Sequence, residues 1–364
     1  MQARSQSLFL VAAALALTLG LPAADAPKPL TPAAATAGAA PKIEKHDVLL
    51  MSLSINDHQI LTRMALDGSC RLYLRQKGGF SPVLPSANKG DDFGAASSPD
   101  GKSFAFYSSR TGAVNLWISD PSGANQRPLT ESDSSIAEFH ALSEAPIQFS
   151  QDSKQIAYLQ SDNLWLCDSS GNNPRALTHE QGVSTFAWSP DGHHLAYLRY
   201  GSIHLVNSTG APDELLAADA ANYPTLAFNA DAKSPDLFCF YNGVWRLNTV
   251  TKKRQRLGGS FCFPNRIQYN PGADMIAYLG YSSDARVEIF QSPASKKNPV
   301  QLTQGGAASP FYSRDGKWIY FSRKGGLWRI SLAGEKAYAV YEGSVSMASA
   351  ASLEFSPAAA GGCQ

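Results

Sequence analysis

Length, composition and charge are those of an ordinary globular protein. The chain has 364 residues, 44% of them hydrophobic, and 31 Lys and Arg residues balance 30 Asp and Glu residues to leave a formal net charge of +1. Because a dedicated nucleic-acid surface normally brings a basic excess, we expect no nucleic-acid partner. The one basic run, 252–256, is interpreted as a solvated turn between outer strands.

Residues 1–26 have the pattern of a secretory signal peptide. Arg4 supplies a positive charge, the apolar run 8–21 follows, and the small residues Ala23, Ala24 and Ala26 come next. The run is too short to span a bilayer comfortably, and no cysteine follows it that could carry a lipid anchor. The sequence therefore predicts a Sec-type signal peptide and a periplasmic or secreted protein without a transmembrane segment.

Two segments lack the composition of folded structure. Residues 27–46 are rich in Ala, Pro and Thr, and residues 358–364 are small and polar. Neither segment has an apolar pattern with which to bury surface. We expect a disordered linker and a disordered tail on either side of a folded region spanning 47–357.

A short pattern recurs along the folded region. In its clearest copy, the turn residues 98–101 precede the apolar and aromatic run 104–107, which is typical of a half-buried strand. The turn aspartates that anchor the repeats lie 39 to 52 residues apart; they are Asp57, Asp100, Asp152, Asp191, Asp231, Asp274 and Asp315. A period of this length, made of short strands, is typical of propeller blades.

Each repeat carries two further elements after its turn. The first is a Leu-Trp or Val-Trp pair, with the tryptophans at Trp117, Trp165, Trp245 and Trp328. The second is a closing Leu-Thr pair, found at 129–130, 177–178 and 302–303. Each unit is therefore interpreted as four strands, the third containing the Trp and the fourth the Leu-Thr pair.

One four-stranded sheet cannot bury both of its faces, whereas sheets stacked radially can. The sequence accordingly predicts an all-β fold, a β-propeller with seven four-stranded blades, with six or eight as alternatives. We expect the recurring tryptophans to be largely buried between adjacent sheets.

The repeat resembles that of the TolB-like β-propellers, a WD40-like (PD40) repeat family. The resemblance is strongest at 94–130, where SPDGK is followed by LWISDPSG and then by LT, and it covers residues 47 to 357. The TolB propeller has six blades preceded by a small α/β domain, whereas seven units here follow only a short linker. TolB-like propellers serve as periplasmic protein-interaction modules, so the resemblance implies a binding scaffold.

Signatures of catalysis and of metal binding are missing from the sequence. It has no GxSxG elbow, no HExxH, no Walker-type loop, no CxxC pair and no histidine cluster with zinc spacing. We therefore assign no catalytic residue, no metal site and no cofactor. The turn residues Asp100, Asp191 and Asp315 have a sufficient structural role as turn caps, and His193-His194 is expected to face solvent.

Two other positions leave alternatives open. His204 takes the place of the recurring Trp, and we interpret it as a core or edge histidine. Cys239 and Cys262 lie in neighbouring strand-like runs, and in an exported protein they can form a disulfide. Buried unpaired thiols are the other interpretation.

The candidate binding residues lie on one face of the predicted propeller. The longest interval between repeats contains an insertion, 131–145, in a connection between blades. Such connections share a face with the loops between second and third strands; we call it the insertion-bearing face and the opposite one the turn face. Loops on a rigid scaffold are where function concentrates. The candidates on the insertion-bearing face are His140, Glu144, His179, Glu180, Tyr223, Arg266, Arg110, Tyr200, Asp284 and Arg323.

These observations predict a monomeric, exported scaffold that binds an envelope or extracellular protein, peptide or glycan. The alternative is an enzyme with its site at the mouth of the central channel, of the glycan hydrolase, lyase or lactonase type. A third possibility is a propeller that belongs to a larger complex and has no site of its own.

The segment 352–357 resembles the first strand and turn of another repeat. An open array of blades would expose two sheet edges, which invites aggregation. We therefore expect this segment to pair within the first blade, beside a strand from 48–75, and so to close the ring.

Export is tested by the N-terminus of the mature protein. Mass spectrometry of exported material should find it between Ala23 and Lys28, because cleavage follows small residues after the apolar run. An intact Met1 on the exported protein would contradict the prediction.

Overall fold

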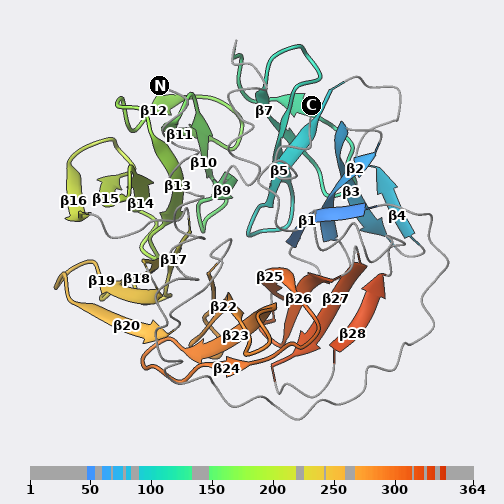
Figure 1. Ribbon diagram of the computed structural model, residues 1–364. Coiled ribbons are helices and arrows are strands. Elements are labelled where there is room, and N and C mark those ends of the chain that lie inside the picture. Colours follow the sequence, from blue (N-terminus) through green and yellow to red (C-terminus); the bar gives the residue numbers. More distant parts are fainter. Residues whose placement is uncertain are drawn as a thin grey trace, which may run out of the picture.

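The protein is a ring of seven small sheets in the part of the chain that the computed structural model describes. That part comprises residues 47–53, 60–66, 69–76, 79–82, 90–132, 147–218, 225–241, 243–258, 267–313, 315–323, 326–332 and 337–341. Within it the regular structure is all strand, arranged as seven four-stranded antiparallel sheets around a centre (Figure 1). This confirms the predicted all-β propeller, with seven blades. In these ranges no helix is long and apolar enough to cross a membrane.

Every blade is built from four consecutive strands, and the strand order in each sheet follows the chain. The first strands of neighbouring blades contact one another around the ring centre, and the fourth strands lie at the periphery (Figure 1). The strands, in chain order, are β1 (Asp47–Leu53), β2 (Ile60–Leu66), β3 (Ser69–Gln76), β4 (Gly79–Pro82), β5 (Asp92–Ser97), β6 (Phe104–Ser108), β7 (Asn115–Ser119), β8 (Arg127–Pro128), β9 (Ile147–Phe149), β10 (Gln155–Gln160), β11 (Asn163–Asp168), β12 (Arg175–Ala176), β13 (Val183–Trp188), β14 (His194–Arg199), β15 (Ser202–Asn207), β16 (Asp213–Ala217), β17 (Leu226–Phe228), β18 (Asp236–Phe240), β19 (Val244–Asn248), β20 (Arg254–Gly258), β21 (Gln268–Asn270), β22 (Met275–Tyr281), β23 (Val287–Pro293), β24 (Val300–Gln301), β25 (Ala308–Tyr312), β26 (Trp318–Arg323), β27 (Gly326–Ser331) and β28 (Ala337–Tyr341).

The repeated turn is held by its serine and aspartate. Ser98 Oγ donates to Asp100 Oδ1 (2.7 Å), and the same oxygen accepts the backbone N–H of Lys102 (3.1 Å). The backbone N–H of Ser103 donates to Ser98 Oγ (3.1 Å), and Gly101 takes a φ of +76°. The same bonds recur at 150–155, 189–194 and 313–318. The turn-capping role predicted for the aspartates is confirmed.

The closing Leu-Thr pair acts through the threonine hydroxyl. Thr130 Oγ1 accepts the backbone N–H of Leu116 (2.9 Å) and donates to Asn115 Oδ1 (3.2 Å). Equivalent bonds join Thr178 to Leu164 and Asn163, and Thr303 to Ile289 and Glu288. The fourth strands β8, β12 and β24 contain only two residues each and end before the Leu-Thr pair. The pair was predicted to lie within the fourth strand, but it follows that strand. The reason is that the threonine hydroxyl, rather than a backbone carbonyl, accepts the N–H of the third strand.

Alternate residues of each second strand pack against the two neighbouring blades. In β14, Leu195 and Tyr197 join a core cluster with blade three, whereas Ala196 and Leu198 join a cluster with blade five. The same alternation holds in β10, β18 and β22. Because successive side chains of a strand point to opposite faces, the hydrophobic core is a series of layers between blades.

The recurring tryptophans lie in these layers on the third strands. Trp117 is buried, as predicted. Trp165, Trp245 and Trp328 are only partly buried, each packed against a core cluster. They occupy the outer part of the interface, beyond the second strand, so Trp117 is the most deeply buried and the other three are covered only in part.

The first and last blades are neighbours in the ring. Strand β1 contacts β25, β26 and β27, and the blue first blade lies beside the red last blade (Figure 1). The first sheet already has four consecutive strands of its own. The predicted closing segment 352–357 lies outside the described residues, so its pairing stays a prediction.

One buried hydroxyl connects the second and third blades. Tyr107 Oη donates to the backbone carbonyl of Leu159 (2.9 Å) and accepts the backbone N–H of the same residue (2.9 Å). Burial raises the pKa of Tyr107 well above its usual range. By contrast, the buried hydroxyl of Tyr312 has no hydrogen-bond partner among the described residues.

Replacing Tyr107 by Phe should therefore destabilise the fold. The change leaves two buried backbone groups of Leu159 without this partner, at roughly 1–3 kcal/mol for each unsatisfied group. Tyr312→Phe removes a partnerless hydroxyl and should change the free energy of unfolding by less than about 0.5 kcal/mol or raise it. Urea denaturation of both variants measures the difference, and equal losses would contradict the bridging role.

Candidate functional site

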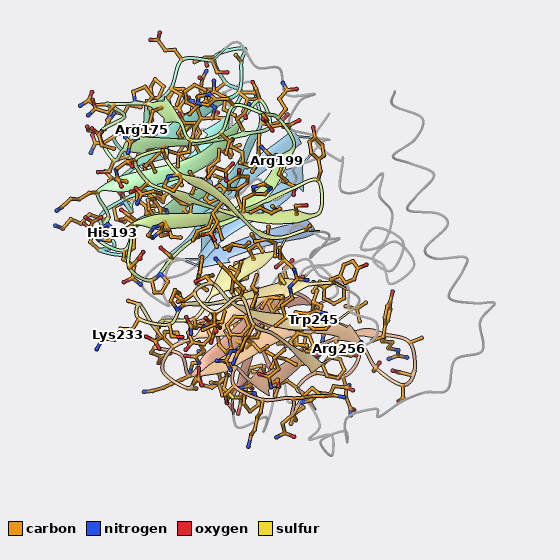
Figure 2. The ribbon with its side chains drawn as sticks, turned by 90° about the vertical axis from the view of Figure 1, so that its left-hand side faces the viewer. Arg175, His193, Arg199, Lys233, Trp245 and Arg256 are labelled. Atoms are coloured by element: carbon orange, nitrogen blue, oxygen red, sulfur yellow. The ribbon has the colours of Figure 1, made fainter. Side chains whose placement is uncertain are left out.

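The two faces of the ring carry different parts of each blade. Figure 2 shows His193 and Lys233, from the turns between first and second strands, at one side of the molecule. Arg199 and Trp245, from the second-to-third strand ends of the same two blades, lie toward the other side. This separates the turn face from the insertion-bearing face as the sequence predicts.

On the turn face, the polar groups are largely satisfied by the turns themselves. Hydrogen bonds from Ser98 and from the backbone N–H of Lys102 lower the pKa of Asp100, and the equivalent bonds lower the pKa of Asp152 and Asp315. His193 is exposed, as predicted, whereas His194 is half-buried and its Nδ1 lies 3.1 Å from Asp191 Oδ2. These carboxylates are occupied in shaping hairpins, so this face offers few groups for a ligand.

The basic run 252–256 spans the end of a turn and the start of the outer strand β20. Lys252 Nζ lies 2.7 Å from Glu214 Oε1 of the neighbouring blade, and Arg254 is exposed. The interpretation as a solvated turn and strand edge is confirmed. Charged side chains on an outer strand also discourage edge-to-edge pairing with other chains.

Arg110, one of the predicted site residues, lies over the sheet of the second blade. Its guanidinium donates to Asp92 Oδ1 (3.1 Å) and Gln126 Oε1 (2.5 Å), and its Nε donates to Ser108 Oγ (2.8 Å). The guanidinium carbon also lies 4.3 Å from the ring centroid of Trp117. The side chain is only 11% exposed. These contacts give Arg110 a structural role as a clamp, because it joins neighbouring segments of the blade.

Arg323 has a related environment in the last blade. Its guanidinium carbon lies 5.0 Å from the Phe321 ring centroid and 5.2 Å from that of Trp328, and its Nε donates to the carbonyl of Gly306 (2.7 Å). Glu288 accepts the backbone N–H of Gly306 (2.7 Å) beside it. Arg323 thus supports the connection between the sixth and seventh blades.

Three of the predicted residues lie near one another on the fourth blade. Glu180 Oε2 is 2.9 Å from Arg199 Nη1, and Tyr200 follows Arg199 directly. His179 precedes Glu180 and is exposed. The Tyr200 ring lies against the backbone of Gly182, where a Cβ would be 2.3 Å from a ring carbon. These residues form the blade-four cluster: His179, Glu180, Gly182, Arg199 and Tyr200.

Asp284 lies on the sixth blade in an exposed loop. Its Oδ2 is 3.2 Å from Arg286 Nε, and both side chains are more than half exposed. Hydrogen bonding by Ser282 lowers the pKa of Asp284. This residue contacts its own loop rather than another of the predicted residues.

His204 replaces the recurring tryptophan, and it is buried as the core-histidine interpretation predicts. Its ring stacks on Tyr197 with centroids 5.0 Å apart, and its Nδ1 is 3.4 Å from Asp213 Oδ1. Tyr197 Oη donates to Asp213 Oδ2 (2.6 Å). Burial lowers the pKa of His204, against the opposing effect of Asp213.

Several predicted positions cannot be placed. His140, Glu144, Tyr223 and Arg266 lie outside the described residues, as does most of the insertion. Cys239 is buried in β18, and its suggested partner Cys262 also lies outside them. Across the described ranges no group of three or more His, Cys, Asp or Glu side chains is arranged to hold a metal ion.

Two exposed aromatic residues of this face, Tyr241 and Tyr281, are not among the residues predicted from the sequence. Tyr241 follows β18 and is 41% exposed, and Tyr281 ends β22 and is 38% exposed. Together with Tyr200 they place an exposed tyrosine at the same end of three successive blades. The signal that would have found them is an aromatic residue at the end of a second strand or directly after it, where a turn residue is expected.

Comparison with known proteins identifies the fold and no family. No protein-family model matches the sequence, and no curated protein matches it either. An oligogalacturonate lyase from Vibrio parahaemolyticus superposes with a TM-score of 0.58 at 12% identity, over 83% of this chain and 88% of that chain. A prolyl endopeptidase superposes with a TM-score of 0.56 at 14% identity, over 81% of this chain and 49% of that chain.

The solved structures similar to this chain also include TolB β-propellers. TolB from Acinetobacter baumannii has a TM-score of 0.46 at 16% identity, over 80% of this chain and 62% of that chain. A TM-score below 0.5 carries no further argument, and identities this low show the fold alone. The neighbours therefore support a propeller and leave the function to the residues of this chain.

The buried and exposed ion pairs of the insertion-bearing face should differ sharply in their effect on stability. Arg110→Met removes a buried guanidinium from the buried carboxylate of Asp92 and should cost about 3 kcal/mol or more. Arg286→Met breaks the exposed pair with Asp284 and should leave the free energy of unfolding nearly unchanged, because solvent screens that pair. Chemical denaturation measures both, and similar losses would show that Arg110 is not a clamp.

Proposed function

We propose that this protein is an exported, monomeric binding scaffold that engages a protein, peptide or glycan of the envelope or the exterior through its insertion-bearing face. The observation that carries the proposal is the set of exposed tyrosines on that face, Tyr200, Tyr241 and Tyr281. Tyrosine combines apolar area with a polar hydroxyl and is enriched at binding surfaces.

The contrast between the two faces supports this assignment. Carboxylates and serines of the turn face are engaged in their own hairpins, whereas the blade-four cluster presents a strongly exposed Glu180 and Tyr200. A rigid propeller core holds these loop residues in place, and function concentrates on such loops. Export rests on the signal-peptide pattern of residues 1–26.

The alternative is an enzyme of the glycan hydrolase, lyase or lactonase type at the channel mouth. One observation favours it, the fold shared with an oligogalacturonate lyase. At 12% identity that likeness extends to the fold alone, and one fold hosts many activities. The scaffold proposal has residues of this chain in its support, and for that reason we prefer it.

Affinity capture with matched surface variants tests the proposal. The mature protein is immobilised and exposed to the envelope fraction and medium of the producing cells, beside a His179→Ala/Glu180→Ala variant and a His193→Ala/Lys233→Ala variant. The same partner should be retained by the wild type and by the turn-face variant. The His179→Ala/Glu180→Ala variant should retain at least about tenfold less of that partner, because truncating residues at the centre of an interface weakens binding by that much.

Equal retention by both variants would show that the insertion-bearing face does not bind. Retention of nothing beyond the bare matrix would contradict the scaffold function altogether. Melting curves of the two variants serve as the folding control, since all four substituted side chains are exposed.

A further inference from the structure

Tyr200 occupies a backbone position that does not suit it. Strands β14 and β15 are joined by the two-residue turn Tyr200-Gly201, whose φ angles are +48° and +83°. Two positive φ angles are typical of a type I′ hairpin, which favours Asn, Asp or Gly. A bulky residue with positive φ is an outlier, and such strain clusters at functional sites.

The neighbouring blade shows that the turn itself does not require an aromatic ring. In blade three the equivalent turn between β10 and β11 is Ser161-Asp162, with φ angles of +48° and +57°. A small polar residue therefore forms the same hairpin. The tyrosine at 200 needs an explanation other than turn chemistry.

Core packing does not supply that explanation. The Tyr200 side chain is 78% exposed, the most exposed of the large hydrophobic residues in the described ranges. Its ring rests on the backbone at Gly182, because a Cβ there would lie 2.3 to 2.6 Å from three ring carbons. Only glycine leaves room for the ring in this position. The ring is thus supported by backbone while most of its surface is open to solvent.

The charged groups beside the ring indicate which ligands suit it. Glu180 is 79% exposed, whereas its partner Arg199 is 18% exposed. Arg199 lies at the start of the turn, on the side of the molecule that also carries Trp245 (Figure 2). The accessible charge next to Tyr200 is therefore a carboxylate, which disfavours a polyanionic ligand.

We propose that Tyr200 is the stacking platform of a site for a neutral glycan, whose chain extends toward Tyr241 and Tyr281 on the next two blades. The proposal rests on the binding function proposed above and specifies its ligand. The aliphatic face of a pyranose ring presents C–H groups, which the negative face of an aromatic ring attracts. Exposed rings that occur singly on successive blades suit a chain of repeating sugar units, whereas a large contiguous apolar patch is the mark of a protein interaction site.

Isothermal titration calorimetry with defined hexasaccharides tests the proposal. Cellohexaose and chitohexaose are the neutral probes, and hexagalacturonate is the anionic one. The variants are Tyr200→Asn, which suits the turn and removes the ring, and Tyr200→Phe, which keeps the ring. Tyr338→Ala is the control, an exposed tyrosine on the outer strand β28.

At least one neutral hexasaccharide should bind the wild type. Tyr200→Asn should weaken that binding by at least about tenfold, whereas Tyr200→Phe and Tyr338→Ala should leave it within about threefold. Because asparagine tolerates positive φ, Tyr200→Asn should also raise the melting temperature, by about 2 °C or more. Weaker binding in a more stable variant excludes misfolding as the cause.

Three results would overturn the proposal: no binding of either neutral probe at about 1 mM, equal binding by the wild type and Tyr200→Asn, or binding of hexagalacturonate alone. Capture of a protein by the insertion-bearing face with no glycan bound would overturn the glycan assignment and leave the scaffold function standing. Glycan binding with no protein captured would support the glycan assignment and overturn binding of a protein or peptide. The two proposals therefore fail separately.

Discussion

Every blade of this protein depends on its two neighbours, because both faces of each sheet are apolar. In β14, Tyr197 packs toward one adjacent blade and Ala196 toward the other. An isolated sheet of this kind would expose both faces to water, and burial of apolar area is the main favourable term in folding. Closing the ring, with β1 against the last blade, covers the faces that a linear array would leave open.

The layered core also limits where polar side chains can lie. Within the layers, a polar group must be satisfied locally, as Tyr107 is by both backbone groups of Leu159. At the turn face, serine and aspartate side chains complete the hairpins. The exposed tyrosines Tyr200, Tyr241 and Tyr281 lie at the insertion-bearing face, as does the blade-four cluster.

The fold could be predicted from the sequence because its repeated signals are local. An Asp-Gly turn, an alternating strand and a Trp strand each report on a few adjacent residues, and a regular period assembles them into blades. The position of the Leu-Thr pair was predicted less well. Thr130 binds the third strand through its side-chain hydroxyl. Pairing through a side chain and pairing through the backbone of a strand leave similar sequence patterns, so the sequence did not distinguish them.

The candidate site was harder to predict because exposure depends on distant partners. Arg110 is a polar loop residue in the sequence, yet Asp92 and the Trp117 ring hold it against the sheet. Tyr200 was likewise predicted only as one of ten candidate loop residues, yet its exposure of 78% sets it apart from Arg110. Glycine at 182 allows this, since its missing side chain makes room for the ring. The spacing in the sequence placed both residues on the insertion-bearing face. It did not distinguish Arg110, which is held against the sheet, from Tyr200, whose ring is exposed.

A fold shared with a lyase and an endopeptidase cannot by itself assign an activity. Residues that the fold does not need are therefore the better guide to function. Arg110 and the turn aspartates are needed by the fold, and their contacts explain them. Tyr200 is different. In the preceding blade Ser161 occupies the equivalent position and forms the same hairpin, without strain from a bulky side chain. A residue that costs stability and buries little surface is best explained by a contact absent from the free protein. That reasoning supports the site proposed at the hairpin between β14 and β15.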